Sequence, residues 1–273
     1  NKSITLGSLT LTNGSNGGVA ANYSLSSGTL TVNQRPLSAI LARQYDGTTT
    51  AAGSSLSSFS ALQGGESLSL SGSGTVALKN VGNGKSVTLG SIALADGTGA
   101  ASNYSLSSAT MNVTQRPVIL SGSRPYDGST NALVQNLAIT GTVGGETLTL
   151  TGSGTLNSKD VGNNKSINLG NLIISDGRNS GLASNYNLSS GTLSVDKRKV
   201  ILSGVRSKIK GGRIVLKNEL EIANLVEGET LGLDGNGLIP GNSSKLHPLD
   251  ASKIKLVDGV GSSTNYTLVG GKH

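Results

Sequence analysis

Polar and apolar residues alternate along much of this chain. The segments 86–94 (SVTLGSIAL) and 146–156 (ETLTLTGSGTL) switch between the two classes at almost every step. A period of two is typical of β-strands that bury one face, whereas an amphipathic helix repeats its apolar positions every three or four residues. The best helix candidates, 57–65 and 136–141, are too short and too polar at their flanks to be assigned as helices. The pattern therefore predicts an all-β protein.

The order of elements can be followed through residues 37–113. An opening strand leads to a Tyr-Asp-Gly turn and then to a stretch rich in Ser, Ala and Leu. After these we predict a strand over 66–78 that is broken at its Gly-Ser-Gly, a turn over 79–86, a strand over 87–94, a turn over 95–103 and a closing pair of strands within 104–113. Short strands bounded by Gly, Asn and Asp at intervals of roughly 8 to 12 residues indicate a small sandwich or barrel-like unit.

The same landmarks return along the chain. Tyr45-Asp46-Gly47 is repeated 81 residues later as Tyr126-Asp127-Gly128, and Gly-Gly-Glu at 64–66 returns at 144–146. An Asn-Tyr pair occurs four times, at spacings of 81, 82 and 80 residues: Asn22-Tyr23, Asn103-Tyr104, Asn185-Tyr186 and Asn265-Tyr266. Self-similarity at a fixed period is the signature of a tandem array. We therefore interpret these residues as structural markers of a repeat of about 80 residues.

The markers divide the chain into four units. Residues 1–36 are the C-terminal part of a repeat, 37–117 and 118–198 are full repeats, and 199–273 is a divergent, truncated repeat. The joints VNQRP, VTQRP and VDKRK run from one strand-like stretch directly into the next. Because proline lacks an N–H and restricts the residue before it to extended conformations, Pro36 and Pro117 should end ladder pairing while keeping the chain extended. Short, stiff joints predict an elongated rod.

A parallel β-helix is the alternative architecture. A repeat of this length could hold four coils of about 20 residues, and solenoids stack in this manner. No echo of the Asn-Tyr, Gly-Gly-Glu or Lys-Asn-Val-Gly-Asn motifs occurs at that shorter spacing. The pattern therefore favours separate, bead-like domains.

The composition limits what each unit can contain. Aromatic residues are 3% of the chain, apolar residues are 35%, and there are 40 glycines, so each unit has a small core. Cysteine is absent, which excludes disulfides and Cys-based metal sites. No run of 18 apolar residues is present, and the first residues lack the charged and apolar regions of a signal peptide. Since the sequence begins and ends inside a repeat, we expect any export signal or anchor to lie outside it.

The formal net charge of +7 raises the question of a polyanionic partner. The basic residues are spread along the chain without a dense run, and neither aromatic stacking platforms nor a known reading motif accompanies them. Proteins that bind nucleic acids ordinarily carry such features. We therefore do not expect nucleic acid as a partner.

Several motifs in fixed order support a family resemblance. They are RPVILSGSRPYDGST at 116–130, GSGT at 72–75 and 152–155, KNVGNGKSVTL at 79–89, KDVGNNKSINL at 159–169 and SNYSLSSATMNVTQRP at 102–117. Together they resemble the YDG and MBG-type repeats of very long bacterial surface proteins, many of which are filamentous-haemagglutinin-like adhesins exported by two-partner secretion. The resemblance implies an extracellular stalk of small β domains, either β-grasp-like or immunoglobulin-like, and it implies no reaction.

The fourth unit departs from this pattern. Lys208-Ile209-Lys210 stands where the Tyr-Asp-Gly turn would fall, and GNSSKLHPLD at 241–250 replaces the VGN-KS turn. Glu229, GNG at 235–237 and the Asn-Tyr pair persist. The unit is either a degenerate repeat or a sister type of domain.

The Tyr-Asp-Gly tripeptides are interpreted as turns. The Asp side chain caps nearby N–H groups, the Gly accepts positive φ, and the Tyr ring is expected to be buried at the base of the turn. The alternative is a calcium site at Asp46 and Asp127, but a good calcium site gathers several carboxylates and the local sequence offers one. We therefore predict a buried Tyr126 and a turn at Asp127-Gly128 with no ion bound.

The Asn-Tyr pairs have two interpretations. Asn22, Asn103 and Asn265 lie in formal N-glycosylation sequons, as does Asn13, whereas Asn185 in the equivalent place does not. The pattern therefore favours a structural role, in which the Asn turns the chain ahead of the closing strand and the Tyr packs in the core.

No catalytic, cofactor or metal site is expected. Glu66, Glu146 and Glu229 supply one carboxylate per unit, which is not the pair that glycoside hydrolysis needs. His247 and His273 have no metal-binding companion, and GSGT and GNGKS lack the spacer of a phosphate-binding loop.

The function expected from this sequence is structural rather than enzymatic. The chain is expected to be a stalk segment of a secreted adhesin that spaces a distal binding region for attachment to a cell surface or biofilm matrix. Its partners would be the neighbouring repeats, and through them an extracellular polysaccharide or host surface. The alternative is a carbohydrate-binding module whose lysine-rich last unit holds an anionic matrix polysaccharide.

Overall fold

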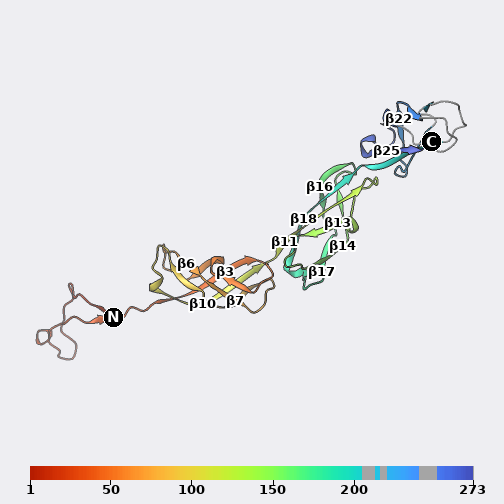
Figure 1. Ribbon diagram of the computed structural model, residues 1–273. Helices are drawn as coiled ribbons and strands as arrows, with labels where there is room; N and C mark the ends of the chain where they lie inside the picture. The colour runs from red at the N-terminus through yellow and green to blue at the C-terminus, as the bar shows by residue number, and fades with distance from the viewer. Residues whose placement is uncertain (205–212, 216–219, 240–250, 273) are drawn as a thin grey trace. The chain divides into compact units, whose positions relative to one another are not determined.

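The computed structural model describes residues 1–204, 213–215, 220–239 and 251–272. The chain divides into two compact units, Asn1–Thr114 and Gln115–His273, and each is described by itself (Figure 1). Strands dominate both units, and the helical elements among the described residues are three-residue 3-10 turns. Some residues singled out in the sequence lie outside the described residues. They are Lys208, Ile209, Lys210, His273 and the predicted replacement turn at 241–250, which includes His247.

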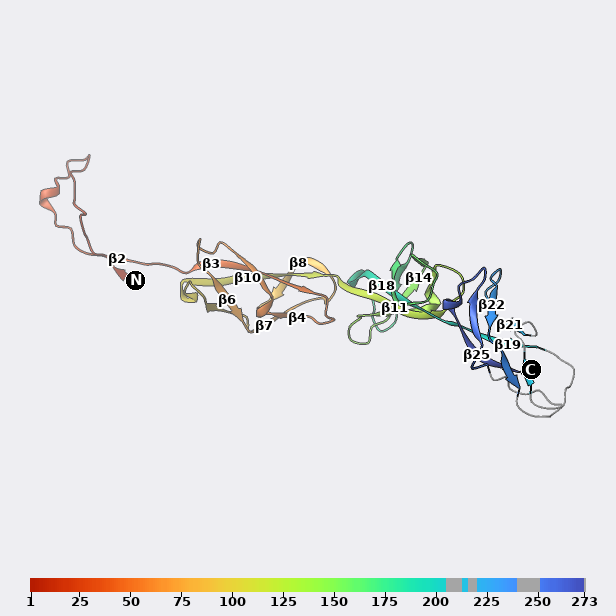
Figure 2. The same cartoon turned by 90° about the horizontal axis from the view of Figure 1, so that it is seen from above.

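The first unit is built around a six-stranded sheet with the order β4-β7-β8-β10-β3-β5. Its strands are β3 (Arg35–Gln44), β4 (Thr50–Ala52), β5 (Leu56–Ser60), β7 (Ser73–Val76), β8 (Gly82–Thr88) and β10 (Tyr104–Thr114). The opening strand β3 and the closing strand β10 are parallel neighbours in the middle, and all other pairs are antiparallel. Strands β6 (Leu68–Ser71) and β9 (Ala93–Asp96) form a separate antiparallel pair, and the 3-10 turns are η2 (Gly53–Ser55) and η3 (Ala101–Asn103). Figure 2 shows the long strands β3 and β10 running side by side.

The second unit repeats this arrangement. Its first sheet has the order β12-β15-β16-β18-β11-β13, with β11 and β18 parallel. Its strands are β11 (Arg116–Pro125), β12 (Asn131–Leu133), β13 (Leu137–Thr140), β15 (Ser153–Leu156), β16 (Gly162–Asn168) and β18 (Tyr186–Asp196). Beside it lie the pair β14 (Leu148–Thr151) and β17 (Ile173–Asp176) and the turns η4 (Val134–Asn136) and η5 (Ala183–Asn185).

The rest of the second unit follows the same plan with fewer described strands. A three-stranded sheet β21-β19-β25 again pairs its opening strand, β19, parallel with its closing strand, β25. The elements are β19 (Arg198–Ser203), β20 (Arg213–Val215), β21 (Glu221–Ala223), β22 (Leu231–Asp234), β23 (Gly237–Ile239), β24 (Lys255–Asp258), η7 (Ser263–Asn265) and β25 (Tyr266–Lys272). The pairs β20–β23 and β22–β24 are antiparallel. The described strands of the divergent last repeat therefore follow the pairing plan of the other repeats.

These sheets confirm an all-β chain of tandem domains. Immunoglobulin sandwiches are built from antiparallel sheets, so the parallel pairing of first and last strands favours the β-grasp-like alternative. A parallel β-helix would pair each strand with the equivalent strand of the next coil, and the antiparallel pairs of β8 with β7 and β10 do not follow that pattern.

Three local predictions differ from the structure. The turn predicted over 79–86 is cut short because β8 already begins at Gly82. The strand predicted over 87–94 is interrupted at Gly90, whose φ of +56° turns the chain between β8 and β9. The closing pair of strands is one long strand, β10, with a register shift between Leu106 and Ser108 that takes up the irregularity.

The prolines at the joints also differ from expectation. Pro36 and Pro117 do not end ladder pairing, because they lie near the start of β3 and β11 and pair with Ser105 and Asn187. The antiparallel partner of β3 begins pairing only at Ser38, so β3 is still an edge strand at Pro36, where proline is tolerated. The closing strand β10 ends at Thr114 and β11 begins at Arg116, so one repeat passes into the next through a single residue.

The core of each repeat lies where the alternating pattern places it. Along β3 the buried residues are Leu37, Ala39 and Leu41, and the intervening side chains are more exposed. The N-terminal segment differs, because it contains only the short pair β1 (Lys2–Ser3) and β2 (Thr29–Leu30) and the turn η1 (Ala20–Asn22). Its Tyr23 is 70% exposed, whereas the equivalent Tyr104 is 5% exposed. The closing-strand sequence therefore buries its tyrosine only where the rest of the repeat packs around it.

Candidate functional site

The Tyr-Asp-Gly turn of the second repeat is held by an arginine three residues before its aspartate. Arg124 Nη1 lies 2.5 Å from Asp127 Oδ1, and Arg124 Nη2 donates to the carbonyl of Ser129 at 2.6 Å. The same carboxylate oxygen accepts the backbone N–H and the hydroxyl of Ser129, at 2.9 and 2.8 Å. Gly128 has a φ of +76°, as a turn of this kind requires. The predicted turn is confirmed, and the arginine is a part of it that the sequence analysis missed.

The first repeat builds its turn in the same way. Arg43 bonds to Asp46 and donates to the carbonyl of Thr48, and the backbone N–H and hydroxyl of Thr48 donate to Asp46 Oδ1 at 2.9 Å each. Gly47 has a φ of +78°. The pattern Arg-x-Tyr-Asp-Gly-[Ser/Thr] is therefore a local unit in which one guanidinium spans the whole turn.

Tyr126 is fully buried, as predicted, and its environment extends beyond its own repeat. The ring belongs to the core cluster that includes Ala132 and Leu156 of its own repeat, and it also packs edge-on against Tyr266 of the following repeat, with centroids 5.4 Å apart and planes at 76°. Its hydroxyl donates to Glu229 Oε1 at 2.6 Å, 103 residues further along the chain. The tyrosine of one repeat is therefore buried in contact with the next.

Glu229 gathers three donors from the two repeats. Tyr126 and Lys159 donate to Oε1 at 2.6 and 2.8 Å, and Tyr266 donates to Oε2 at 2.7 Å. The glutamate side chain is 8% exposed. Burial by itself raises the pKa of this carboxyl, but the hydrogen bonds from Lys159 and the two tyrosines outweigh it and lower the pKa. The group is therefore a buried carboxylate with a complete set of partners.

The partners of Glu229 are shifted in the opposite direction. The hydrogen bond to Glu229 raises the pKa of Lys159 above its ordinary value, and burial together with the bond to Glu229 raises the pKa of Tyr266 to about 12. Burial, followed by the same carboxylate, also raises the pKa of Tyr126. The Lys159 ammonium lies 5.8 Å from the centroid of the Tyr126 ring, which adds a cation–π contact. The cluster is held as one carboxylate, one ammonium and two neutral phenols.

Asn265 makes a second polar contact between the same repeats. Its Oδ1 accepts the backbone N–H of Val161 at 2.9 Å, and its Nδ2 donates to Asp160 Oδ1 at 2.9 Å. The hydrogen bond from Asn265 lowers the pKa of Asp160. The residue was predicted to turn the chain, and it does end η7, but its side chain, only 1% exposed, binds the preceding repeat. The turn itself is capped by Asp258, whose Oδ1 accepts the N–H of Ser263 at 2.6 Å.

Backbone packing and the first residue of β19 complete the contact. Gly128 lies so close to Val226 that a Cβ added to it would stand 2.6 Å from Val226 Cγ1. Arg198, the first residue of β19, donates through Nε to the carbonyl of Asn224 at 2.6 Å and through Nη2 to its side chain at 2.8 Å. We call this site the junction. Its first face comprises Tyr126, Gly128, Lys159, Asp160 and Val161, and its second face comprises Val226, Glu229, Asn265 and Tyr266.

The first face of the junction, Tyr126 to Val161, falls within the part of the chain that a family model matches. The model of the YDG domain matches residues 29–111 and 112–193, which together cover more than half of the chain. The chain belongs to the YDG domain family. Among the curated proteins, none matches its sequence. The YDG motif itself has a clear part in the structure, because its Tyr reaches the next domain, its Asp closes the turn, and its Gly leaves room for Val226.

Parts of this site could have been recognised from repetition alone. Lys79 and Lys159 begin the equivalent KNVGN and KDVGN motifs, and Glu66, Glu146 and Glu229 recur once per repeat. The glutamates were considered only as catalytic candidates and set aside, although Glu66, Glu146 and Glu229 each accept a hydrogen bond from the tyrosine of the Asn-Tyr pair in their own repeat. The signal in the sequence was that the tyrosine of the Asn-Tyr pair and this glutamate recur together, once in each repeat.

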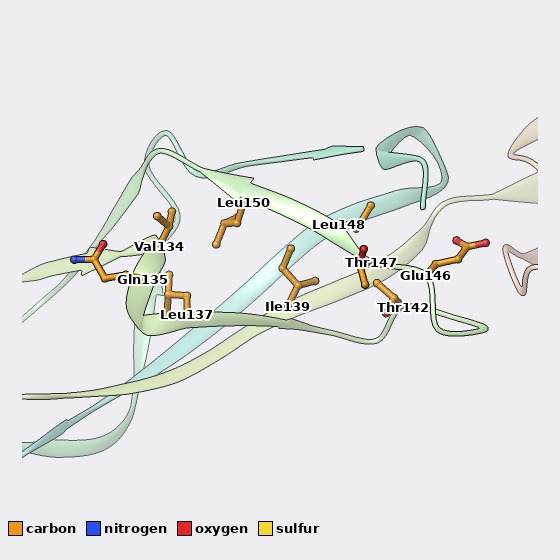
Figure 3. Close-up of a pocket in the computed structure, with 9 residues that line it drawn as sticks. All are labelled: Val134, Gln135, Leu137, Ile139, Thr142, Glu146, Thr147, Leu148 and Leu150. Carbon is orange, nitrogen blue, oxygen red and sulfur yellow. The ribbon is translucent and has the colours of Figure 1, made fainter. Parts of the chain in front are cut away.

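The second YDG domain also has a cleft of about 430 Å³ beside β13 and β14 (Figure 3). It is lined by Val134, Gln135, Leu137, Ile139, Thr142, Glu146, Thr147, Leu148 and Leu150. Its carboxylate, Glu146, already accepts the Tyr186 hydroxyl at 2.7 Å. Within the described part of the chain, no three His, Asp or Glu side chains are grouped as a metal site, and no helix is long and apolar enough to cross a membrane. The junction, by contrast, brings together a carboxylate, an ammonium, two phenols and an amide in one hydrogen-bonded site.

Proposed function

We propose that this chain is a spacer segment of a secreted bacterial surface adhesin, in which successive YDG domains hold a distal binding region away from the cell or within a biofilm matrix. The observation that carries the proposal is Glu229, because a buried carboxylate shared by two repeats ties neighbouring domains through side chains as well as through the linker. Such a tie opposes rotation and separation of the two domains. A spacer needs that property, and a string of freely jointed beads lacks it.

The economy of the junction supports the same role. Most of its residue types recur in each full repeat, namely the Tyr, Gly, Lys and Val of the first face and the Glu, Asn and Tyr of the second, so an additional repeat brings its own connecting residues. The passage from β18 to β19 takes a single residue, Lys197, which leaves a short connection between these two repeats. Length can then grow by duplication without a new kind of contact. The extracellular location in this proposal rests on the resemblance of the repeats to those of bacterial surface adhesins.

The test is made in the cells that carry the parent protein. Deletion of residues 37–198 from the gene, in frame, should leave the protein exported but reduce attachment to a surface or matrix. Insertion of an unrelated β-domain array of similar length in its place should restore attachment, because only spacing is required. An antibody against the segment should label intact cells.

Two outcomes would contradict the proposal. Labelling only after the cells are made permeable would place the segment inside the cell. Attachment that returns with the native segment but not with the unrelated array would assign the segment a binding role of its own, which is the carbohydrate-binding alternative.

A further inference from the structure

The first unit contains a face of the same type as the second face of the junction. Among the described residues of that unit, no tyrosine and lysine of another repeat bind this face as Tyr126 and Lys159 bind Glu229. It consists of Glu66, Tyr104 and Asn103, which stand in the same places as Glu229, Tyr266 and Asn265. The Tyr104 hydroxyl donates to Glu66, and it accepts the backbone N–H of Gln63 at 3.4 Å. In the occupied face the Tyr266 hydroxyl donates to Glu229 and accepts the N–H of Val226 at 3.2 Å. The internal bonding of the two faces is therefore the same.

The glycine beside each glutamate confirms that the faces are built alike. A Cβ on Gly99 would stand 2.8 Å from Glu66 Oε2, and a Cβ on Gly261 would stand 2.5 Å from Glu229 Oε2. Both backbones approach the carboxylate so closely that a side chain in place of the glycine would have to displace it. The carboxylate of the first unit is thus held in place before any partner reaches it.

The two faces differ in what covers them. Glu229 has an ammonium partner, Lys159, whereas Glu66 forms no ion pair with a described residue of the first unit. Asn265 is buried with both side-chain polar atoms bonded, whereas Asn103 is exposed. A fixed carboxylate with an exposed amide beside it offers an acceptor for a cation and a hydroxyl, together with an amide that fits a backbone N–H.

We infer that the face Glu66–Tyr104–Asn103 is a docking surface for the Tyr-Asp-Gly end of another YDG repeat, one that presents a tyrosine, a lysine and a Lys-x-Val turn as Tyr126, Lys159 and Val161 do. The charge match is the argument, because the occupied face shows which groups this acceptor takes. The inference rests on the proposed spacer role and adds to it the rule by which repeats are joined.

The test gives this face a partner within one chain. Residues 115–196, a complete repeat with its first face, are copied in place of residues 1–33 and lead into Gln34 as they now lead into Lys197. Docking should slow hydrogen exchange at the Gln63 amide roughly tenfold or more, as expected for a hydrogen bond to a charged group. Changing the copied Tyr126→Phe should remove most of that slowing, and Glu66→Gln should do the same.

The decisive measurement is the double change. If the face is the docking surface, the copied Tyr126→Phe and Glu66→Gln are strongly non-additive in the exchange rate. Additive effects in a folded chain would overturn the inference while leaving the spacer role intact, since cell attachment tests that role separately.

A second design guards against a copied repeat that does not fold. Residues 118–163 are placed ahead of Asn1, so that residues 1–33 supply the closing strand of the added repeat, and Tyr23 should become protected from solvent. The same pair of substitutions is then measured at Gln63. If neither chain shows protection at Gln63, the face does not take a YDG end and the inference is wrong.

Discussion

The Tyr126 hydroxyl donates a 2.6 Å hydrogen bond to Glu229, and this bond joins the YDG turn of one repeat to the carboxylate of the next. It gives the turn a role beyond its own domain. Loss of the bond should therefore weaken the second unit more than removal of an ordinary surface hydroxyl would.

Tyr126→Phe keeps the ring and deletes only the hydroxyl. We expect the second unit to lose about 1–2 kcal/mol of unfolding free energy, because Glu229 is left with one fewer donor in a buried site. Urea unfolding measures the loss. The matched control is Tyr23→Phe, since Tyr23 is 70% exposed and its change should have almost no effect. Equal effects of the two substitutions would contradict a special role for the junction.

Glu229→Gln removes the charge that Lys159 pairs with. We expect the unfolding free energy to fall by about 1–3 kcal/mol. The fall should be smaller when Glu229→Gln is added to Lys159→Met, because Lys159→Met has already removed the ion pair. Glu227→Gln is the control, since Glu227 is exposed two residues away. Additivity of the Glu229 and Lys159 changes would show that their pairing contributes nothing.

Gly128→Ala combines a backbone cost with a steric cost. The positive φ by itself costs about 1–2 kcal/mol, and contact with Val226 adds about 1–3 kcal/mol. Gly228→Ala pays only the first cost, because Gly228 has a φ of +78° and nothing within 4 Å of its added Cβ. Val226→Ala should relieve Gly128→Ala but not Gly228→Ala. Thermal unfolding of Gly128→Ala and Gly228→Ala, each with and without Val226→Ala, separates the backbone cost from the steric cost.

The stability of the second unit should fall at both ends of the pH range. The pKa of Glu229 is lower in the folded protein than in the unfolded chain, so its contribution is present above the unfolded value of about 4.3 and is lost as the pH falls through the folded value. The pKa of Tyr266 is raised to about 12, so its contribution is present below the unfolded value of about 10 and is lost as the pH rises toward 12.

Urea midpoints measured across the pH range test these directions. Glu229→Gln should flatten the acid limb, because the group that titrates is gone. An acid limb unchanged in that variant would assign the loss to other carboxylates.

Arg124→Lys tests the turn separately from the junction. Lysine can reach either Asp127 or the Ser129 carbonyl but cannot span both with a planar fork, so we expect a loss of about 1–2 kcal/mol. Arg178→Lys, at an exposed arginine outside the Tyr-Asp-Gly turn, should be nearly neutral by comparison. Unfolding of both variants by urea provides the comparison. Equal losses of unfolding free energy would contradict the role of Arg124 in holding the turn.

Much of the fold follows from the sequence because its causes are local. Alternation along 86–94 and 146–156 predicts strands, although the break at Gly90 depends on a turn that alternation does not reveal. Asp127-Gly128 predicts a turn because the chemistry of that turn lies within a few residues. The positions of Pro36 and Pro117 were misjudged because strand pairing depends on where the neighbouring strand β5 or β13 begins, which no local rule supplies.

The sequence by itself determined the all-β class, the repeat and the residues that mark it. It did so because alternation, turn chemistry and period are each carried by residues near one another or at fixed intervals. Only the tertiary structure decided what those markers do. Tyr126 and Glu229 meet because the opening and closing strands of each repeat are parallel neighbours, β11 with β18 and β19 with β25. The end of β11, where the YDG turn follows, therefore lies beside the end of β18 that leads into β19, and the Asn-Tyr start of β25 lies beside the start of β19. A contact across 103 residues depends on that topology, and no pattern within one repeat specifies it.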